Sequence, residues 1–233
     1  MNVIKGWHLP DWDTHYEGML KEYDGKWEYQ KDTRDFSLAY VKDFTKECID
    51  VGGNIGFWSR DLANKFKFVH AFEPHPDNIL AFKTNMKETN YTLYSVAVSD
   101  KRAGRVDLFS SPDECGNVSL NEWGVQTGNS LRKLEQEQLS KITVDVVAID
   151  DYNFTNIGFM KVDVQGNERN VVLGAEQMLR NNDVTLVLEL PMSPGRKTYE
   201  EEKKEHDTIV DILKEYGYEK KGQLRKEAVF QKC

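Results

Sequence analysis

The chain has 233 residues, 39% of them hydrophobic and 11% aromatic, and this length fits one domain with a modest extension better than two domains. Its formal net charge of −8 gives no basic surplus to drive phosphate-backbone binding, so we expect no nucleic-acid partner. No apolar run approaches the roughly 20 residues that span a bilayer, and residues 1–10 lack the pattern of a secretory signal. We therefore expect a soluble, cytoplasmic protein without membrane partners; the oligomeric state is not predicted.

Residues 1–44 combine aromatic side chains with charges and show no clean period of 2 or 3.6. We predict that they form a capping extension on a domain that covers residues 45–233. Aromatic side chains bury large apolar areas, so core packing is the favoured role for those of the extension. For Trp27 and Tyr29, stacking on a sugar acceptor remains an alternative.

From Lys46 onward, short β-rich runs alternate with segments of helical period, which is typical of βαβ units and a parallel sheet. The predicted strands are Glu47–Val51, Val69–Phe72, Thr92–Val98, Arg105–Phe109, Ile142–Ile149, Phe159–Val164, Thr185–Leu190, and a closing pair near Tyr218 and at Ala228–Gln231. The predicted helices are Phe57–Phe66, one that begins at Pro76-Asp77, Asn167–Arg180 and Tyr199–Tyr216. The polar stretch Ser110–Lys141 has a length typical of a lid or binding loop. The fold class is α/β, with a doubly wound, mostly parallel sheet and helices on both faces.

The strongest local signal is Asp50–Gly56, where an apolar strand runs into a glycine-rich turn and then a helix. Glycines adopt positive φ and let backbone approach a ligand closely, and the start of a helix offers unpaired N–H groups. The dinucleotide pattern G-x-G-x-x-G fails in both frames, because Val51 in one frame, and Asn54 and Phe57 in the other, stand where glycine is required. The turn therefore predicts a small-ligand site of another kind.

Glu73 lies at the carboxyl end of the next predicted strand and is followed by Pro74. A carboxylate in that place can accept hydrogen bonds from both hydroxyls of a ribose, as adenosine-containing ligands require. We therefore expect the pocket to hold an adenosine.

Several blocks of the chain together resemble the FkbM-type methyltransferases, in that family's order. The blocks are Asp50–Gly56 (DVGGNIG), Phe72–Pro76 (FEPHP), Ala97–Asp100 (AVSD) followed by Gly104, Gly116–Leu120 (GNVSL), and Lys161–Glu168 (KVDVQGNE) running on to Leu173-Gly174-Ala175. The resemblance covers about Cys48–Leu190. It implies a seven-stranded class I methyltransferase fold (Rossmann-like), S-adenosylmethionine as methyl donor, and O-methylation of a hydroxyl on a sugar, glycan or related small metabolite.

The same resemblance assigns cofactor-binding positions along these blocks. The implied residues are Asp50, Gly52, Gly53, Asn54 and Gly56 for the methionine end, Glu73 with Pro74 for the ribose, and Ala97, Val98 and Ser99 for the adenine edge.

Three carboxylates are candidates for the base that accepts the proton of the acceptor hydroxyl. Asp163 ends a strand and faces the crevice where ligands of open α/β sheets bind, although it could instead cap the next helix. Glu189 stands inside an apolar strand, so it must be either paired or functional. Glu168 could owe its place to the dipole of the helix that it begins.

We expect no bound metal, although Asp145, Asp150 and Asp151 form an acidic group that could serve as ligands. The last two also fit a boundary between a strand and a turn. Two other functions stay open at this point. One is an NAD(P)-dependent oxidoreductase on a Rossmann fold, and the other is a non-catalytic scaffold that retains the methyltransferase fold.

Overall fold

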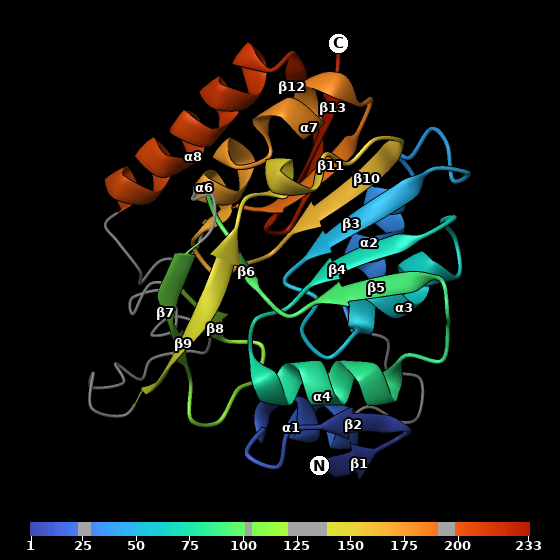
Figure 1. Ribbon diagram of the computed structural model, residues 1–233, viewed down its shortest axis with the longest axis vertical. Coiled ribbons are helices and arrows are strands. Elements are labelled where there is room, and N and C mark those ends of the chain that lie inside the picture. Colours follow the sequence, from blue (N-terminus) through green and yellow to red (C-terminus); the bar gives the residue numbers. More distant parts are fainter. Residues whose placement is uncertain (23–28, 101–103, 121–138, 191–198) are drawn as a thin grey trace.

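The structure is a computed structural model that describes residues 1–22, 29–100, 104–120, 139–190 and 199–233. Its centre is a seven-stranded sheet with the strand order β12-β13-β11-β10-β3-β4-β5 (Figure 1). These strands are β3 (Glu47–Val51), β4 (Val69–Phe72), β5 (Tyr91–Tyr94), β10 (Ile157–Val162), β11 (Thr185–Glu189), β12 (Tyr218–Leu224) and β13 (Glu227–Lys232). Neighbours pair in parallel except at β13, which is antiparallel to both β11 and β12. The predicted mostly parallel, seven-stranded sheet is confirmed.

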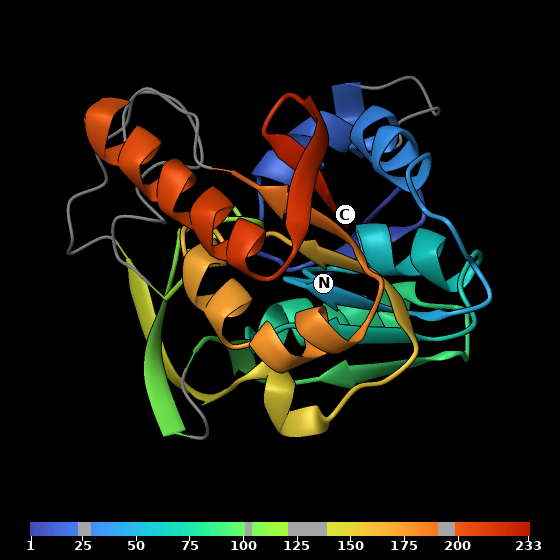
Figure 2. The ribbon, with the colours of Figure 1, turned by 90° about the horizontal axis from the view of Figure 1, so that it is seen from above.

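Helices cover both faces of this sheet, as a doubly wound fold requires (Figure 2). One face packs against α6 (Glu168–Leu173), α7 (Glu176–Asn181) and α8 (Tyr199–Glu215), and the other against α2 (Lys31–Leu38), α3 (Phe57–Ala63) and α4 (Pro76–Asn85). Alternate residues of a strand supply the two cores: Ile49 and Val51 belong to the first, and Cys48 to the second. Both faces of the central strands are therefore buried, which explains their nearly continuous apolar sequence.

A smaller sheet of order β6-β9-β7-β8 stands beside the carboxyl ends of the main strands (Figure 1). Its strands are β6 (Ala97–Val98), β7 (Gly104–Ser110), β8 (Val118–Ser119) and β9 (Ser140–Val147). The prediction of a single strand over Thr92–Val98 is wrong: the main sheet ends at Tyr94, and Ala97 and Val98 pair with β9 instead. A bend at Val96 separates the two pieces, and an unbroken β-favouring run does not reveal it. Of the predicted excursion Ser110–Lys141, residues 121–138 lie outside the described residues.

The single helix predicted over Asn167–Arg180 is also wrong, because the chain breaks at Gly174 and Ala175 into α6 and α7. A Cβ atom on Gly174 would lie 2.1 Å from the carbonyl oxygen of Ser99, so the close approach of these segments requires glycine. Asp150 then caps the second helix, because its carboxylate accepts hydrogen bonds from two backbone N–H groups of α7, both at 2.9 Å. The predicted apolar stripe survives the break.

The described parts of residues 1–44 form two strands and two helices despite their lack of a period. A hairpin of β1 (Asn2–Ile4) and β2 (Trp7–Leu9) precedes α1 (His15–Glu22) and α2. The hairpin is fastened to α4, because the side chain of Asn85 accepts from the N–H of His8 at 2.7 Å and donates to its carbonyl at 3.0 Å. Tyr16 is buried against Phe57, as core packing predicts, whereas Trp27 lies outside the described residues.

Within the described ranges, no helix combines the length and the apolar character needed to cross a membrane.

Candidate active site

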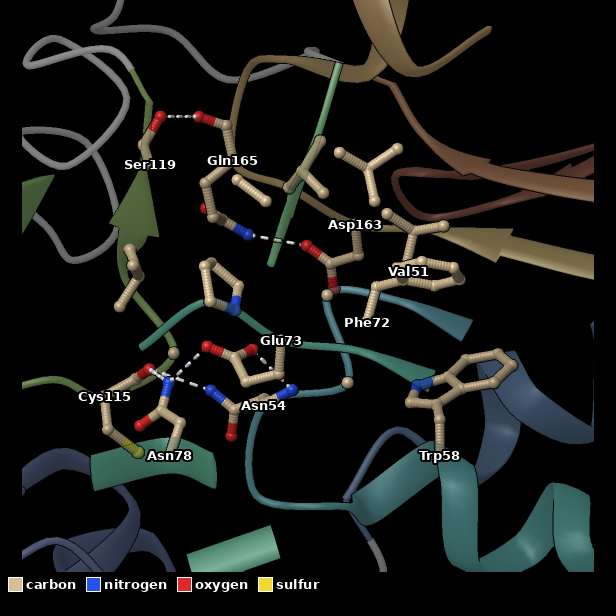
Figure 3. Close-up of a pocket in the computed structure, with 18 of the residues that line it drawn as sticks. Val51, Asn54, Trp58, Phe72, Glu73, Asn78, Cys115, Ser119, Asp163 and Gln165 are labelled. Carbon is tan, nitrogen blue, oxygen red and sulfur yellow. Dashed lines mark hydrogen bonds between the residues drawn. The ribbon is translucent and has the colours of Figure 1, made fainter. Parts of the chain in front are cut away.

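A cleft opens at the carboxyl ends of β3, β4 and β10, the place where open α/β sheets bind their ligands (Figure 3). It encloses about 80 Å³. Predicted site residues that line it are Gly52, Gly53, Asn54, Glu73, Pro74, Ala97, Val98 and Asp163. The remaining predicted residues, Asp50, Gly56, Ser99, Glu168 and Glu189, do not line this cleft but surround or support it.

The turn after β3 needs its glycines for local reasons. Gly52 has φ +85°, and a Cβ atom on it would lie 1.9 Å from the carbonyl oxygen of Asp163, where the ends of β3 and β10 meet. Gly56 has φ +98° and begins α3 without a side-chain cap. Between them Asn54, also left-handed at φ +48°, donates its N–H to the Glu73 carboxylate at 2.8 Å. The turn is therefore tied to the ends of both neighbouring strands.

Glu73 sits at the centre of a hydrogen-bonded group at the bottom of the cleft (Figure 3). Besides the N–H of Asn54, its carboxylate accepts the N–H of His75 at 2.9 Å and the amide of Asn78 at 3.3 Å. Burial raises the pKa of Glu73 to about 7, against the opposing effect of these donors. The Asn78 amide has a better acceptor in the carbonyl of Cys115 at 2.9 Å. Because a carboxylate offers about four acceptor positions, Glu73 retains capacity for ribose hydroxyls, above all if Asn78 releases it.

The smaller sheet contributes mainly apolar side chains to the cleft. Ala97 and Val98 line it, as does Phe72 at the end of β4. Ser99 does not line it, because its N–H donates to Val147 at 2.9 Å and its hydroxyl to Asp100 at 3.1 Å. An apolar wall with few polar atoms suits a planar heterocycle such as adenine.

A buried lysine controls the charge of the opposite wall. Lys161 is 4% exposed, and its ammonium lies 3.3 Å from Asp163 and 3.9 Å from Asp50. Burial opposes ionisation of Asp163, but Lys161 and the hydrogen bonds to the carboxylate outweigh it and hold the pKa of Asp163 below its usual range. For Asp50, which lies beneath the cleft and accepts the hydroxyl of Ser59 at 2.6 Å, burial dominates and raises the pKa. Asp163 is therefore the charged carboxylate at the cleft surface.

Gln165 joins the two predicted acids at the ends of β10 and β11. Its side-chain amide donates to Asp163 at 2.8 Å and to Glu189 at 3.0 Å (Figure 3 shows the first contact). Burial, followed by repulsion from Asp163, raises the pKa of Glu189 well above its usual range, although Lys226 lies 3.3 Å from it. Asp163 does not cap a helix, and Glu189 is paired.

Glu168 is turned inward, away from the cleft. One of its oxygens accepts the N–H groups of Val164 at 3.2 Å and Gly166 at 3.0 Å, which fixes the loop after β10. Burial raises the pKa of Glu168 to about 7. Glu168 is the first residue of α6, which agrees with the alternative that the dipole at the start of a helix favours a carboxylate there.

Two residues at this site, Lys161 and Tyr16, were missed by sequence reasoning. Lys161 is a charged residue in a buried strand, and the argument that singled out Glu189 applies to it equally. Tyr16 lines the cleft together with Tyr29, and their hydroxyl groups are 3.3 Å apart. Tyr29 had been kept as an alternative contact for a sugar acceptor, but no local pattern places either tyrosine over the strand ends.

The acidic group considered as a metal site is dispersed. Asp145 is exposed beside Arg105 at 3.6 Å, while the carboxylates of Asp150 and Asp151 accept backbone N–H groups. In the part of the chain that the structure describes, no group of three or more His, Cys, Asp or Glu side chains is placed to hold a metal ion.

The strand order, the glycine turn after β3 and the acid after β4 define the class of protein, which is that of the S-adenosylmethionine-dependent methyltransferases of class I fold. The model of the Methyltransferase FkbM domain matches residues 50–220, and the chain belongs to this family. This membership argues against the oxidoreductase alternative.

Individual relatives agree with this classification. Methyltransferase 1 of Beauveria bassiana is 30% identical over 165 residues, which cover 63% of this chain and 65% of that protein. The crystal structure of Methyltransferase FkbM from Methylobacillus flagellatus KT has a TM-score of 0.51 at 15% identity, covering 84% of this chain and 47% of that chain. A protein of Streptococcus mutans, solved in complex with SAH, has a TM-score of 0.50 at 12% identity, covering 87% of this chain and 97% of that one. At these identities the two solved structures share the fold alone. The chain thus spans about two thirds of the curated relative and about half of the first solved structure.

Proposed function

We propose that the chain transfers the methyl group of S-adenosylmethionine to a hydroxyl of a sugar, glycan or related small hydrophilic metabolite. One observation carries the proposal: an ionised Asp163 stands in the same cleft as the glycine turn and the ribose-type acid Glu73. A base and a cofactor cradle on adjoining walls are what transfer to a hydroxyl needs.

The residues present fit the cofactor by their chemistry. Glu73 would accept from the ribose hydroxyls, the turn Gly52–Asn54 would border the methionine end, and Ala97 with Val98 would cover the adenine. Asp50, Gly56 and Ser99 would not contact the cofactor. They would hold in place the turn after β3 and the residues that cover the adenine. The enclosed 80 Å³ is below the roughly 300–1,000 Å³ of small-molecule sites, so a bound cofactor would extend beyond the enclosed part of the cleft.

Among the three candidate acids, we assign the role of base to Asp163. The bound cofactor supplies an electrophilic methyl on a positively charged sulfur, which departs as a neutral thioether. Asp163 would accept the hydroxyl proton as the oxygen–carbon bond forms, while Lys161 keeps it ionised beforehand. Glu189 and Glu168 would support it, the first through the shared amide of Gln165 and the second by fixing the loop.

The test is a thermal-shift series with S-adenosylmethionine, S-adenosylhomocysteine (SAH) and NAD, repeated on Glu73→Ala. We expect stabilisation by the first two ligands only, and its loss in the variant. Stabilisation by NAD alone would overturn the proposal. SAH binding without methylation of any hydroxylated compound would favour a non-catalytic scaffold.

Asp163→Asn separates catalysis from binding. We expect turnover to fall by about 10²–10⁴-fold, with SAH affinity within about twofold of the wild type, because the base acts on the acceptor. Unchanged turnover would remove Asp163 from this role.

A further inference from the structure

A second hollow of about 280 Å³ adjoins the cleft, and we name it the side chamber. The two hollows share Tyr16, Tyr29, Gln30, Gly116, Asp163 and Gln165. The volume of the side chamber lies near the lower end of the roughly 300–1,000 Å³ typical of small-molecule sites. Since Asp163 belongs to both walls, a molecule in the side chamber can present a group to Asp163 at the border of the cleft.

The lining of the side chamber is mostly polar. It includes four carboxylates, and none of the described lining residues has an aliphatic hydrocarbon side chain. Three of the carboxylates have partners within the protein. Asp163 and Glu189 share the amide of Gln165, and Glu114 lies 3.7 Å from His15.

The fourth carboxylate, Glu227, lacks such a partner. It is the first residue of β13 and is 7% exposed, and among the described residues no other side chain forms a hydrogen bond or ion pair with it. The register of β11 and β13 places it directly opposite Glu189, another acid. Of the two cations of the chamber wall, Lys226 lies 3.3 Å from Glu189 and Arg225 lies 2.5 Å from Asp32, and Lys226 attracts Glu227 only from a longer distance.

The carboxylate of Glu227 accepts its own backbone N–H but has no side-chain donor. A buried carboxylate with so little compensation is costly, and an ammonium group compensates it better than a neutral hydroxyl does. We propose that the side chamber binds the acceptor through a protonated amine that pairs with Glu227, and that it thereby presents a hydroxyl of the same molecule to Asp163. The acceptor class is an amino sugar or amino alcohol. The identity of the methylated group rests on the function proposed above, but the cation site does not.

The test compares matched pairs of probes that differ in charge: glucosamine against glucose, and ethanolamine against ethylene glycol. Isothermal titration at pH 7 measures each probe, with and without saturating SAH. We expect each amine to bind at least about tenfold more tightly than its neutral partner. In Glu227→Gln the difference should shrink to within about twofold, whereas Glu219→Gln, which changes an exposed acid on the neighbouring strand β12, should keep it.

Several results overturn the proposal: equal affinity within both pairs, no measurable binding of either amine, or a preference that persists in Glu227→Gln. Methyl transfer to the nitrogen of glucosamine, read by mass spectrometry, would overturn the assigned orientation. SAH affinity serves as an independent readout, because Glu227 does not line the cleft and its replacement should leave that affinity within about twofold. If SAH does not bind but the amine preference holds, the proposed function fails and the cation site stands.

Discussion

Replacing Lys161 with methionine tests the charge arrangement beneath the cleft. Methionine fills similar space without the charge, so the change removes a cation from between Asp163 at 3.3 Å and Asp50 at 3.9 Å. The side chains of Lys161 and Asp50 are 5% and 0% exposed, so water cannot replace Lys161 as the partner of Asp50. Removing one partner of a buried ion pair costs about 3–5 kcal/mol, and we expect that loss in the free energy of unfolding at pH 8.

The loss should depend on pH. In the variant, the pKa of Asp163 and that of Asp50 rise above their unfolded values, so the folded state retains protons that the unfolded state releases as the pH increases. The stability of the variant therefore falls as pH rises above about 4, and its deficit against the wild type should be clearly smaller at pH 5 than at pH 8. In the wild type, the lowered pKa of Asp163 contributes stability that is present above its unfolded pKa and is lost at lower pH.

Urea denaturation followed by tryptophan fluorescence at both pH values measures these deficits. Lys67→Met provides the control, because Lys67 is an exposed lysine 3.6 Å from Glu47, a surface pair worth about 0–1 kcal/mol. A deficit for Lys161→Met no larger than that of the control at pH 8, or the same deficit at both pH values, would refute the reasoning.

Three further outcomes are expected. Gly52→Ala should lower the free energy of unfolding by about 2–5 kcal/mol, since positive φ costs about 1–2 kcal/mol and steric overlap about 1–3 kcal/mol. Gly217→Ala is the control: Gly217 has φ +86° and no atom within 4 Å of the new Cβ, so this variant should lose only the roughly 1–2 kcal/mol that positive φ costs. Equal losses of the two variants in denaturation would contradict this. Glu168→Gln should raise the melting temperature at pH 8 but not at pH 5. The pKa of Glu168 is about 7 in the folded state and near 4.5 in the unfolded state, so ionisation destabilises the folded protein as the pH rises from about 4.5 to 7, whereas glutamine keeps the acceptor oxygen without ionising. A lower melting temperature of the variant at pH 8 would count against this reasoning. SAH affinity should rise as pH increases through about 7, because Glu73 ionises there and its carboxylate accepts ribose hydroxyls more strongly. Titration calorimetry should show no such rise in Glu73→Gln. A wild-type affinity that does not change with pH would refute this prediction.

The sequence predicts the main sheet well because its strands are buried on both faces and read as short apolar runs between turn residues. It also places Glu73 and Asp163 at strand ends, where a parallel sheet gathers them at one edge. What it does not predict depends on contacts between distant segments. The helix breaks at Gly174 where the backbone of Ser99 approaches it closely, and the predicted strand Thr92–Val98 is split because Ala97 and Val98 pair with β9.

The same limit applies to the site. The charge of Asp163 follows from Lys161, two residues away on the same strand and visible in the sequence. Tyr16 and Tyr29 reach the cleft because they pack against Phe57 of α3, and periodicity carries no information about that contact.

The wall shared by the cleft and the side chamber is built from segments that are far apart along the chain. Tyr16, Tyr29 and Gln30 come from the first 44 residues, whereas Asp163 and Gln165 come from the loop after β10. Under the proposed function, acceptor recognition would therefore vary with residues 1–44, while the proposed base Asp163 would stay unchanged. A chimera that carries the corresponding segment of a relative would test whether this segment sets acceptor preference without changing the proposed base.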